Sequence, residues 1–135
     1  MLLDTGPLVA TLDAAGQWHA RCAPLWDIYL DRCVTTEAVV TEACHFLQRG
    51  GGSAALPVEF LLAAAIPIVG LETGLQRHAA RLMRRYADVP MDYADASLVA
   101  LADALNLGAV ATTDRRGFGA YRRSRGEGFE ILPQT

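Results

Sequence analysis

The sequence predicts an α/β fold in which helices cover both faces of a parallel sheet. Short apolar segments of strand length alternate with longer segments of helical length along the whole chain. Strands that are buried on both faces have this continuously apolar character, and parallel strands need a helix to connect them. The chain has 135 residues, which suffices for one domain with its own core, so we expect a single domain over residues 1–135.

The first half of the chain begins with a buried strand that ends at Asp4-Thr5-Gly6-Pro7. Pro7 is placed to open a helix. Thr36 can cap a later helix, which three glycines from Gly50 onward bring to an end. We expect strands at 1–3, 33–34 and 66–69, and helices that begin at Pro7 and cover 17–30, 36–48 and 54–64.

The second half of the chain continues the alternation with two helices and two strands. Thr73 or Gly74 starts a helix that ends near Tyr86, and a helix over 92–106 is closed by Gly108. The apolar segments 109–111 and 129–132 are the fourth and fifth strands.

Composition excludes several classes of protein. The chain is 52% hydrophobic and 20% charged, as ordinary globular domains are and disordered chains are not. No apolar run reaches the roughly 20 residues that a membrane-spanning helix needs. Leu2 and Leu3 lead directly into Asp4, without a basic leader. We therefore expect a cytoplasmic protein that has no membrane partner.

All basic residues of the chain are arginine, which excludes every mechanism that depends on a lysine ammonium group. The net charge is -3, yet the arginines fall into two dense groups. Such groups either contact phosphates or form solvated faces, and the sequence leaves both readings open. One group comprises Arg77, Arg81, Arg84 and Arg85, and the other Arg115, Arg116, Arg122, Arg123 and Arg125.

Acidic residues follow two of the expected strands. Asp4 ends the first strand, and Asp114 follows the fourth strand by two threonines. An aspartate after a strand is commonly a turn residue. Ligands of parallel α/β sheets, however, collect at the carboxyl ends of the strands, so two such aspartates on neighbouring strands would meet at one edge.

Two further acids lie beside apolar helix faces. Glu42 borders the stripe formed by Val39, Val40, Ala43, Phe46 and Leu47, although a surface glutamate is an equally good reading. Asp95 shares its helix face with Leu98, Val99 and Ala102, where an unpaired charge is costly. Capping is the alternative for this helix start: Asp92 would be the N-cap and Asp95 an acid of the first turn. Capping explains Asp92 but not why Asp95 faces the core.

Four carboxylates gathered in this way repel one another, and no lysine is present to compensate them. A cation can do so. Oxygen ligands favour Mg²⁺ or Mn²⁺ over zinc, which usually recruits Cys or His. Such ions activate water and neutralise the charge that builds up on a phosphate during hydrolysis.

Three segments resemble PIN-domain ribonucleases, in particular the VapC-type toxins of bacterial toxin–antitoxin pairs. They are MLLDTGPLVA at residues 1–10, TEAVVTEACHFL at 36–47 and MDYADASLVALADALNLGAVATTDRRGF at 91–118. The resemblance covers essentially the whole chain in the family's order and spacing. It implies a three-layer α/β/α sandwich with a five-stranded parallel sheet of order 3-2-1-4-5.

The resemblance also implies an acidic metal site formed by Asp4, Glu42, Asp95 and Asp114, with Thr112 and Thr5 as supporting hydroxyls. The implied activity is Mg²⁺-dependent endonucleolytic cleavage of RNA that leaves a 5′-phosphate and a 3′-hydroxyl. Family members commonly form homodimers and are held inactive by a small antitoxin protein. Asp92 is a fifth acid, either a helix cap or a further supporting ligand.

We therefore expect Asp4, Asp95 and Asp114 to hold one cation, and Glu42 to hold a second or to orient the attacking water. Arg115 and Arg116, directly after Asp114, are candidates for holding the RNA backbone, or they form a solvated helix start. A phosphatase of the haloacid dehalogenase type is disfavoured, because its second acid would stand at Gly6 and its lysine is missing or replaced. Two alternatives stay open: a PIN-like module that binds RNA or protein without cleaving, and a PIN nuclease of RNA processing outside a toxin–antitoxin pair.

Overall fold

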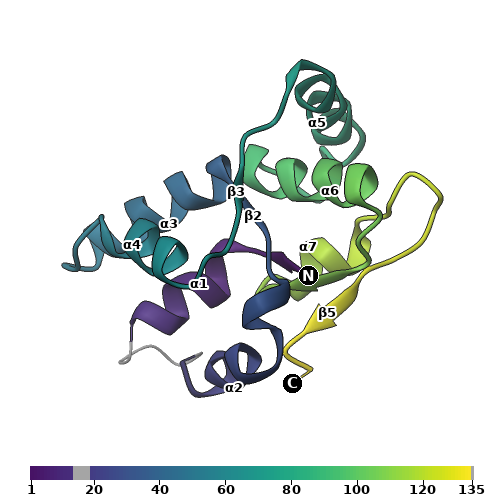
Figure 1. Ribbon diagram of the computed structural model, residues 1–135. Helices are drawn as coiled ribbons and strands as arrows, with labels where there is room; N and C mark the ends of the chain where they lie inside the picture. The colour runs from purple at the N-terminus through teal and green to yellow at the C-terminus, as the bar shows by residue number, and fades with distance from the viewer. Residues whose placement is uncertain (14–18, 135) are drawn as a thin grey trace.

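A computed structural model describes residues 1–13 and 19–134 of the chain (Figure 1). The strands are β1 (Leu2–Leu3), β2 (Thr35–Thr36), β3 (Ile68–Val69), β4 (Ala109–Ala111) and β5 (Glu130–Leu132). The helices are α1 (Thr5–Leu12), α2 (His19–Tyr29), α3 (Glu37–Arg49), α4 (Leu56–Ala63), α5 (Thr73–Arg85), α6 (Tyr93–Leu105) and α7 (Arg115–Ala120), and a short 3₁₀ helix (Leu30–Arg32) follows α2.

The strands are parallel but form two sheets. One sheet has the order β1-β4-β5 and the other pairs β2 with β3. A single bridge between Leu2 and Val34 links them. The segment that contains β2 contacts both sheets: Val34 pairs with Leu2 of β1, and the next two residues pair with β3. The expected continuous five-stranded sheet of order 3-2-1-4-5 is therefore not confirmed.

Helices cover both faces of the three-stranded sheet. Leu2 of β1 and Val110 of β4 belong to one buried cluster, with Leu98 of α6 and Phe118 of α7. Leu3 and Ala111, the next residue of each strand, belong to the other cluster, formed mainly with α1 to α4. Successive residues of a strand point to opposite faces, so the two clusters are the cores of the two helical layers. The structure thus confirms the α/β architecture.

Most expected elements are present with shifted ends. Thr36 caps α3 by accepting a hydrogen bond from the Val39 amide, as expected. The expected helix start at Gln17 lies outside the described residues, and within them α2 begins at His19. Helix α7 was not among the elements expected along the chain, although a helix start was one of the two readings of Arg115 and Arg116. Gly117 and Gly119 lower its intrinsic helix propensity, and its six residues are too few to show a periodic pattern.

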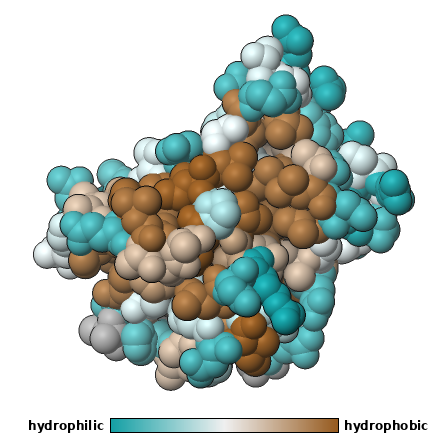
Figure 2. Space-filling model, in the orientation of Figure 1, coloured by the Kyte–Doolittle hydropathy of each residue, from teal (hydrophilic) through white to brown (hydrophobic). Residues whose placement is uncertain are grey.

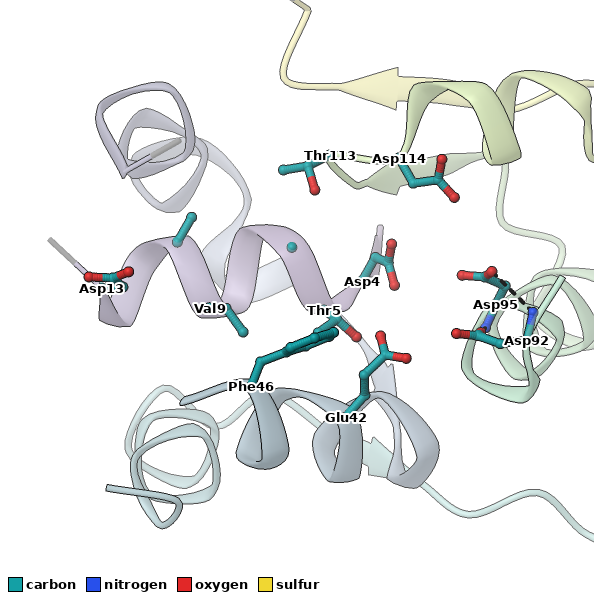
Figure 3. Close-up of a pocket in the computed structure, with 12 residues that line it drawn as sticks. Asp4, Thr5, Val9, Asp13, Glu42, Phe46, Asp92, Asp95, Thr113 and Asp114 are labelled. Carbon is teal, nitrogen blue, oxygen red and sulfur yellow. Dashed lines mark hydrogen bonds between the residues drawn. The ribbon is translucent and has the colours of Figure 1, made fainter. Parts of the chain in front are cut away.

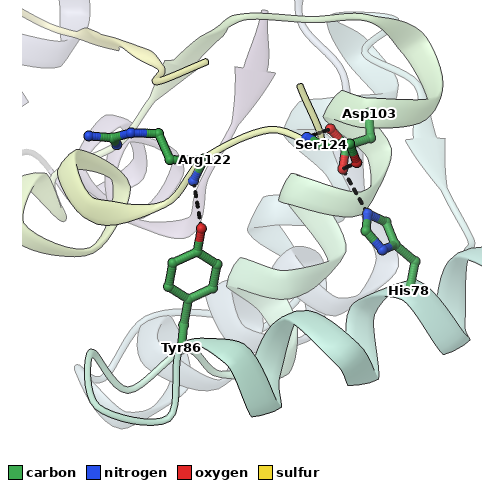
Figure 4. Close-up of polar contacts among 5 residues, drawn as sticks. All are labelled: His78, Tyr86, Asp103, Arg122 and Ser124. Carbon is green, nitrogen blue, oxygen red and sulfur yellow. Dashed lines mark hydrogen bonds and ion pairs between the residues drawn. The ribbon is translucent and has the colours of Figure 1, made fainter. Parts of the chain in front are cut away.

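Helices α5 and α6 form an antiparallel hairpin. Side-chain hydrogen bonds connect this hairpin to the loop after α7 (Figure 4). His78 of α5 contacts Asp103 of α6 at 2.7 Å, and Asp103 also accepts hydrogen bonds from the backbone amide and the hydroxyl of Ser124. The Tyr86 hydroxyl accepts a hydrogen bond from the Arg122 amide at 3.0 Å. These contacts hold the hairpin against the chain segment that follows α7.

One face of the molecule carries a broad apolar band across its centre, with hydrophilic side chains around α5 (Figure 2). Large hydrophobic side chains exposed on the molecule include Phe46, Leu62 and Leu105. None of the helices seen in the described part of the chain has the length and apolar character to cross a membrane.

Candidate metal centre

Acidic side chains from separate parts of the chain line a single pocket of about 480 Å³ (Figure 3). The lining comes from α1, α3, the start of α6, and the turn between β4 and α7. It contains all four acids expected from the sequence. The lining residues are Asp4, Thr5, Gly6, Val9, Ala10, Asp13, Glu42, Phe46, Asp92, Asp95, Thr113 and Asp114.

Asp4 is held at the end of β1 by the neighbouring strand. Its backbone amide donates to the Ala111 carbonyl of β4 at 3.0 Å, and its side chain accepts a hydrogen bond from the Thr112 hydroxyl at 2.7 Å. The residue is 5% exposed. Burial raises the pKa of the Asp4 carboxyl from 3.8 to about 6, although the Thr112 hydrogen bond opposes the rise.

Thr112 connects Asp4 to Asp114. Its buried hydroxyl donates to Oδ2 of Asp4 and accepts from the Asp114 amide at 2.9 Å. Asp114 then caps α7, because its Oδ1 accepts from the Gly117 amide at 2.9 Å. A side chain at position 117 would collide with the Asp114 carboxylate, so glycine is required there. The pairing of β1 with β4 thus brings the two strand-end aspartates to one pocket.

Asp92 and Asp95 form a reciprocal capping box at the start of α6. Asp92 Oδ1 accepts from the Asp95 amide at 2.8 Å, and Asp95 Oδ2 faces the Asp92 amide at 3.4 Å. Asp95 is also half-buried and lines the pocket. It therefore belongs both to the cap of α6 and to the pocket. Burial, followed by the charges of Asp4 and Asp92, raises the pKa of Asp95 from 3.8 to about 8.

Tyr121 is a contact of the site that the sequence did not indicate. Its hydroxyl donates to Oδ2 of Asp95 at 3.3 Å, and its ring packs edge-on against Phe118 and Tyr86. The residue is fully buried. Burial and then the Asp95 charge raise its pKa above the ordinary 10, so the phenol stays a hydrogen-bond donor. Tyr121 directly follows the unexpected helix α7, and no sequence pattern placed it near α6.

Glu42 reaches the pocket from the half-buried flank of α3 (Figure 3). Burial raises its pKa from 4.5 to about 7, while the Thr5 hydroxyl opposes the rise and Asp92 adds to it. Oγ1 of Thr5 is buried without a hydrogen bond of ordinary geometry among the described residues. A ligand that offers an electropositive or hydrogen-bonding group beside Glu42 would satisfy this oxygen.

The two arginines expected at the site differ in their surroundings. Arg115 is half-buried, and its guanidinium donates to the Pro133 carbonyl next to β5. Arg116 is exposed. Neither lines the acidic pocket, and no arginine does among the residues that the structure describes.

The donor set of the pocket fits a hard divalent cation. It consists of carboxylate and hydroxyl oxygens, the ligands that Mg²⁺ and Mn²⁺ prefer. The raised pKa values of Asp4, Glu42 and Asp95 mean that the charged form of each carboxylate is less stable in this pocket than in water. As the side chains stand, no three Asp, Glu, His or Cys residues within 1–13 and 19–134 lie close enough to enclose an ion. Binding would therefore have to draw the carboxylates together.

In each of three aspartates, one carboxylate oxygen accepts a hydrogen bond that fixes the orientation of the side chain. Asp4 Oδ2 is held by Thr112, Asp95 Oδ2 by Tyr121 and Asp114 Oδ1 by Gly117. Such contacts orient a carboxylate so that its second oxygen is available to a ligand in the pocket.

Comparison with known proteins agrees with this geometry. The PIN domain family matches residues 1–123 of the chain. Ribonuclease VapC26 of Mycobacterium tuberculosis is 33% identical over 135 residues, which cover 98% of this chain and 100% of that protein. The crystal structure of Mycobacterium tuberculosis VapC20, a toxin that cleaves the sarcin–ricin loop, matches with a TM-score of 0.79 at 17% identity, over 89% of this chain and 95% of that one. The chain belongs to the PIN domain family, among its VapC-type ribonucleases.

Proposed function

We propose that this protein is a Mg²⁺- or Mn²⁺-dependent endoribonuclease, the toxin of a VapBC-type pair, built as one PIN domain over residues 1–135. The observation that carries this proposal is the pocket in which Asp4, Glu42, Asp95 and Asp114 come together without a basic side chain in its described lining. Such a pocket disfavours a bare phosphate and favours a cation that then binds the phosphate.

Each residue of the pocket has a proposed task. Asp4, Asp95 and Asp114 would hold the cation, with Thr112, Thr5 and Asp92 keeping carboxylates in place. When bound, a divalent cation polarises the scissile phosphate and neutralises charge on it. Glu42, which lines the pocket from α3, would orient the attacking water and accept its proton. Arg115 and Arg116 would hold the RNA backbone beside Asp114.

Cleavage is tested by incubating purified protein with total RNA in Mg²⁺, Mn²⁺ or EDTA. We expect products with 5′-phosphate ends in either metal and none in EDTA. Asp4→Asn and Asp95→Asn should each abolish cleavage while the circular dichroism spectrum stays that of the wild type. Asp27→Asn, at an exposed position of α2, is the matched control. Undiminished cleavage by either pocket variant contradicts the assignment.

RNA binding without cleavage is the competing function. A PIN-like binding module has no need for four carboxylates whose charges repel one another, so retention of all four favours hydrolysis. Binding of RNA by the wild type in Mg²⁺ without the appearance of new ends would establish the alternative.

The proposed partners are a structured RNA of the translation machinery, a small VapB-like antitoxin and a second copy of the chain, in the cytoplasm. The antitoxin is tested by growth arrest on expression and its relief by the product of a short neighbouring reading frame. Arrest that no neighbouring gene relieves would favour a nuclease of RNA processing outside a toxin–antitoxin pair. Sedimentation of the purified protein tests the dimer.

A further inference from the structure

Four arginines of α5 form a basic stripe that the proposed catalytic pocket does not use. Arg77, Arg81, Arg84 and Arg85 are spaced by four, three and one residues, which places them along one side of a helix. All four are exposed, whereas Ala79 and Leu82 are the buried residues of the opposite side. Helix α5 contains no acidic residue, and the hydrophilic region around it stands out in Figure 2.

No ion pair holds the arginines of this stripe in the described parts of the chain. The ion pairs in the described parts of the chain involve Arg32, His78 and Arg123, and none of the four stripe arginines. Glu72, the N-cap of α5, lies close enough to Arg77 for that arginine to contribute to lowering its pKa, after the Gly74 and Leu75 amides. The uncompensated part of the stripe is therefore its C-terminal end.

That end of α5 lies beside the acidic pocket. Tyr86, the residue after Arg85, packs its ring against Tyr121 with 5.1 Å between centroids. The Tyr121 hydroxyl in turn donates to Asp95 in the pocket. Tyr86 and Tyr121, packed edge-on, thus lie between the end of the basic stripe and Asp95. The loop that carries the exposed Arg122 is bound to the same Tyr86.

The carboxylates of the pocket repel the phosphates of an RNA strand. An RNA strand that enters the pocket therefore needs positively charged side chains nearby to bind its phosphates. The stripe from Arg77 to Arg85 extends over roughly 12 Å of helix, long enough for contact with more than one phosphate. Guanidinium groups bind phosphate oxygens in pairs and remain charged at any physiological pH. The overall charge of -3 repels a polyanion at long range, so an RNA backbone has to be bound by a local positive region such as this one.

We propose that the arginine stripe of α5 binds the RNA backbone on one side of the cleavage pocket, with Arg81 and Arg84 as its central contacts. The stripe would hold the strand by its phosphates, independently of sequence, while the pocket carries out hydrolysis. This inference rests on the proposed nuclease function, and it names the surface that carries the substrate beyond the pocket.

The test compares two double variants: Arg81→Gln/Arg84→Gln, and the control Arg32→Gln/Arg49→Gln, whose arginines are exposed elsewhere. RNA affinity is measured by fluorescence anisotropy of a labelled single-stranded RNA in EDTA, over a series of salt concentrations. Loss of two phosphate contacts lowers the slope of log K against log salt by about 1.4 and weakens low-salt binding by roughly tenfold or more. We expect this of the α5 variant and a near wild-type slope of the control.

Equal slopes for both double variants would overturn the inference, since the effect would then be one of net charge. Wild-type RNA binding by the α5 variant, together with lost binding of a purified acidic partner protein, would assign the stripe to a protein and overturn it as well. Matched thermal melting curves exclude misfolding. Because binding is read in EDTA, a wild type that binds RNA through α5 but never cuts it would contradict the nuclease proposal alone.

Discussion

Neutralising Asp4 should stabilise the metal-free protein at alkaline pH. Its carboxyl is 5% exposed, and its pKa is raised from 3.8 to about 6. An acid with a raised pKa in the folded state loses its proton first in the unfolded state. The folded form is therefore favoured most at low pH, and this advantage is lost between about pH 4 and pH 6. Asp4→Asn cannot ionise and escapes this loss.

The expected size of the effect follows from the pKa values. The difference between 3.8 and about 6 corresponds to about 3 kcal/mol at pH 8. Asparagine, like the protonated carboxyl, keeps a neutral oxygen to accept the Thr112 hydroxyl, and the pKa of about 6 already includes that hydrogen bond. We expect a gain of about 3 kcal/mol, which for a chain of this size raises the Tm by roughly 9 °C.

Thermal unfolding in EDTA at pH 4 and pH 8 measures this gain. The Tm advantage of Asp4→Asn should be small at pH 4 and appear in full at pH 8, while Asp27→Asn follows the wild type at both. Millimolar Mg²⁺ at pH 8 should raise the Tm of the wild type more than that of Asp4→Asn. A stability difference that does not grow from pH 4 to pH 8 would refute the claim that the pocket holds a strained charge.

Three further substitutions test the supports of the pocket. Thr112→Val keeps the side-chain shape but removes the hydroxyl that donates to Asp4 and accepts from the Asp114 amide, so unfolding in urea should show a loss of about 2 kcal/mol. Tyr121→Phe keeps the ring contacts and removes the hydroxyl that donates to Asp95. The Mn²⁺ affinity measured by titration calorimetry should fall roughly tenfold. An unchanged affinity would mean that the hydroxyl has a purely structural role. Gly117→Ala inserts a Cβ against the Asp114 carboxylate and the Tyr121 hydroxyl; it should cost about 1–3 kcal/mol and reduce cleavage, whereas Gly119→Ala, with nothing near its Cβ, should cost less.

The sequence was most informative where one strand or helix determines a position. Asp4 and Asp114 follow strands β1 and β4, and the pairing of these strands suffices to bring both to one pocket. The apolar face of α6 likewise indicated that Asp95 points inward, and the residue is half-buried in the pocket lining. Local pattern fails where a feature depends on short elements. Strands of two residues carry too little pattern to show that only a single bridge, at Val34, links β1 to the segment that contains β2.

Asp95 shows why a choice between structural and functional readings can be misleading. Its amide donates to Asp92 as a capping box requires, and its carboxylate accepts a hydrogen bond from the buried Tyr121 hydroxyl. The cap fixes the backbone at the start of α6, and Tyr121, positioned by the glycine-containing helix α7, fixes the side chain. The spacing of the acids indicates the local contact with Asp92, but it does not indicate the contact with Tyr121, which lies 26 residues away in the chain. The same carboxylate can therefore stabilise the helix start and be oriented for a cation, and a substitution that separates these tasks must alter Tyr121 and leave Asp92 in place.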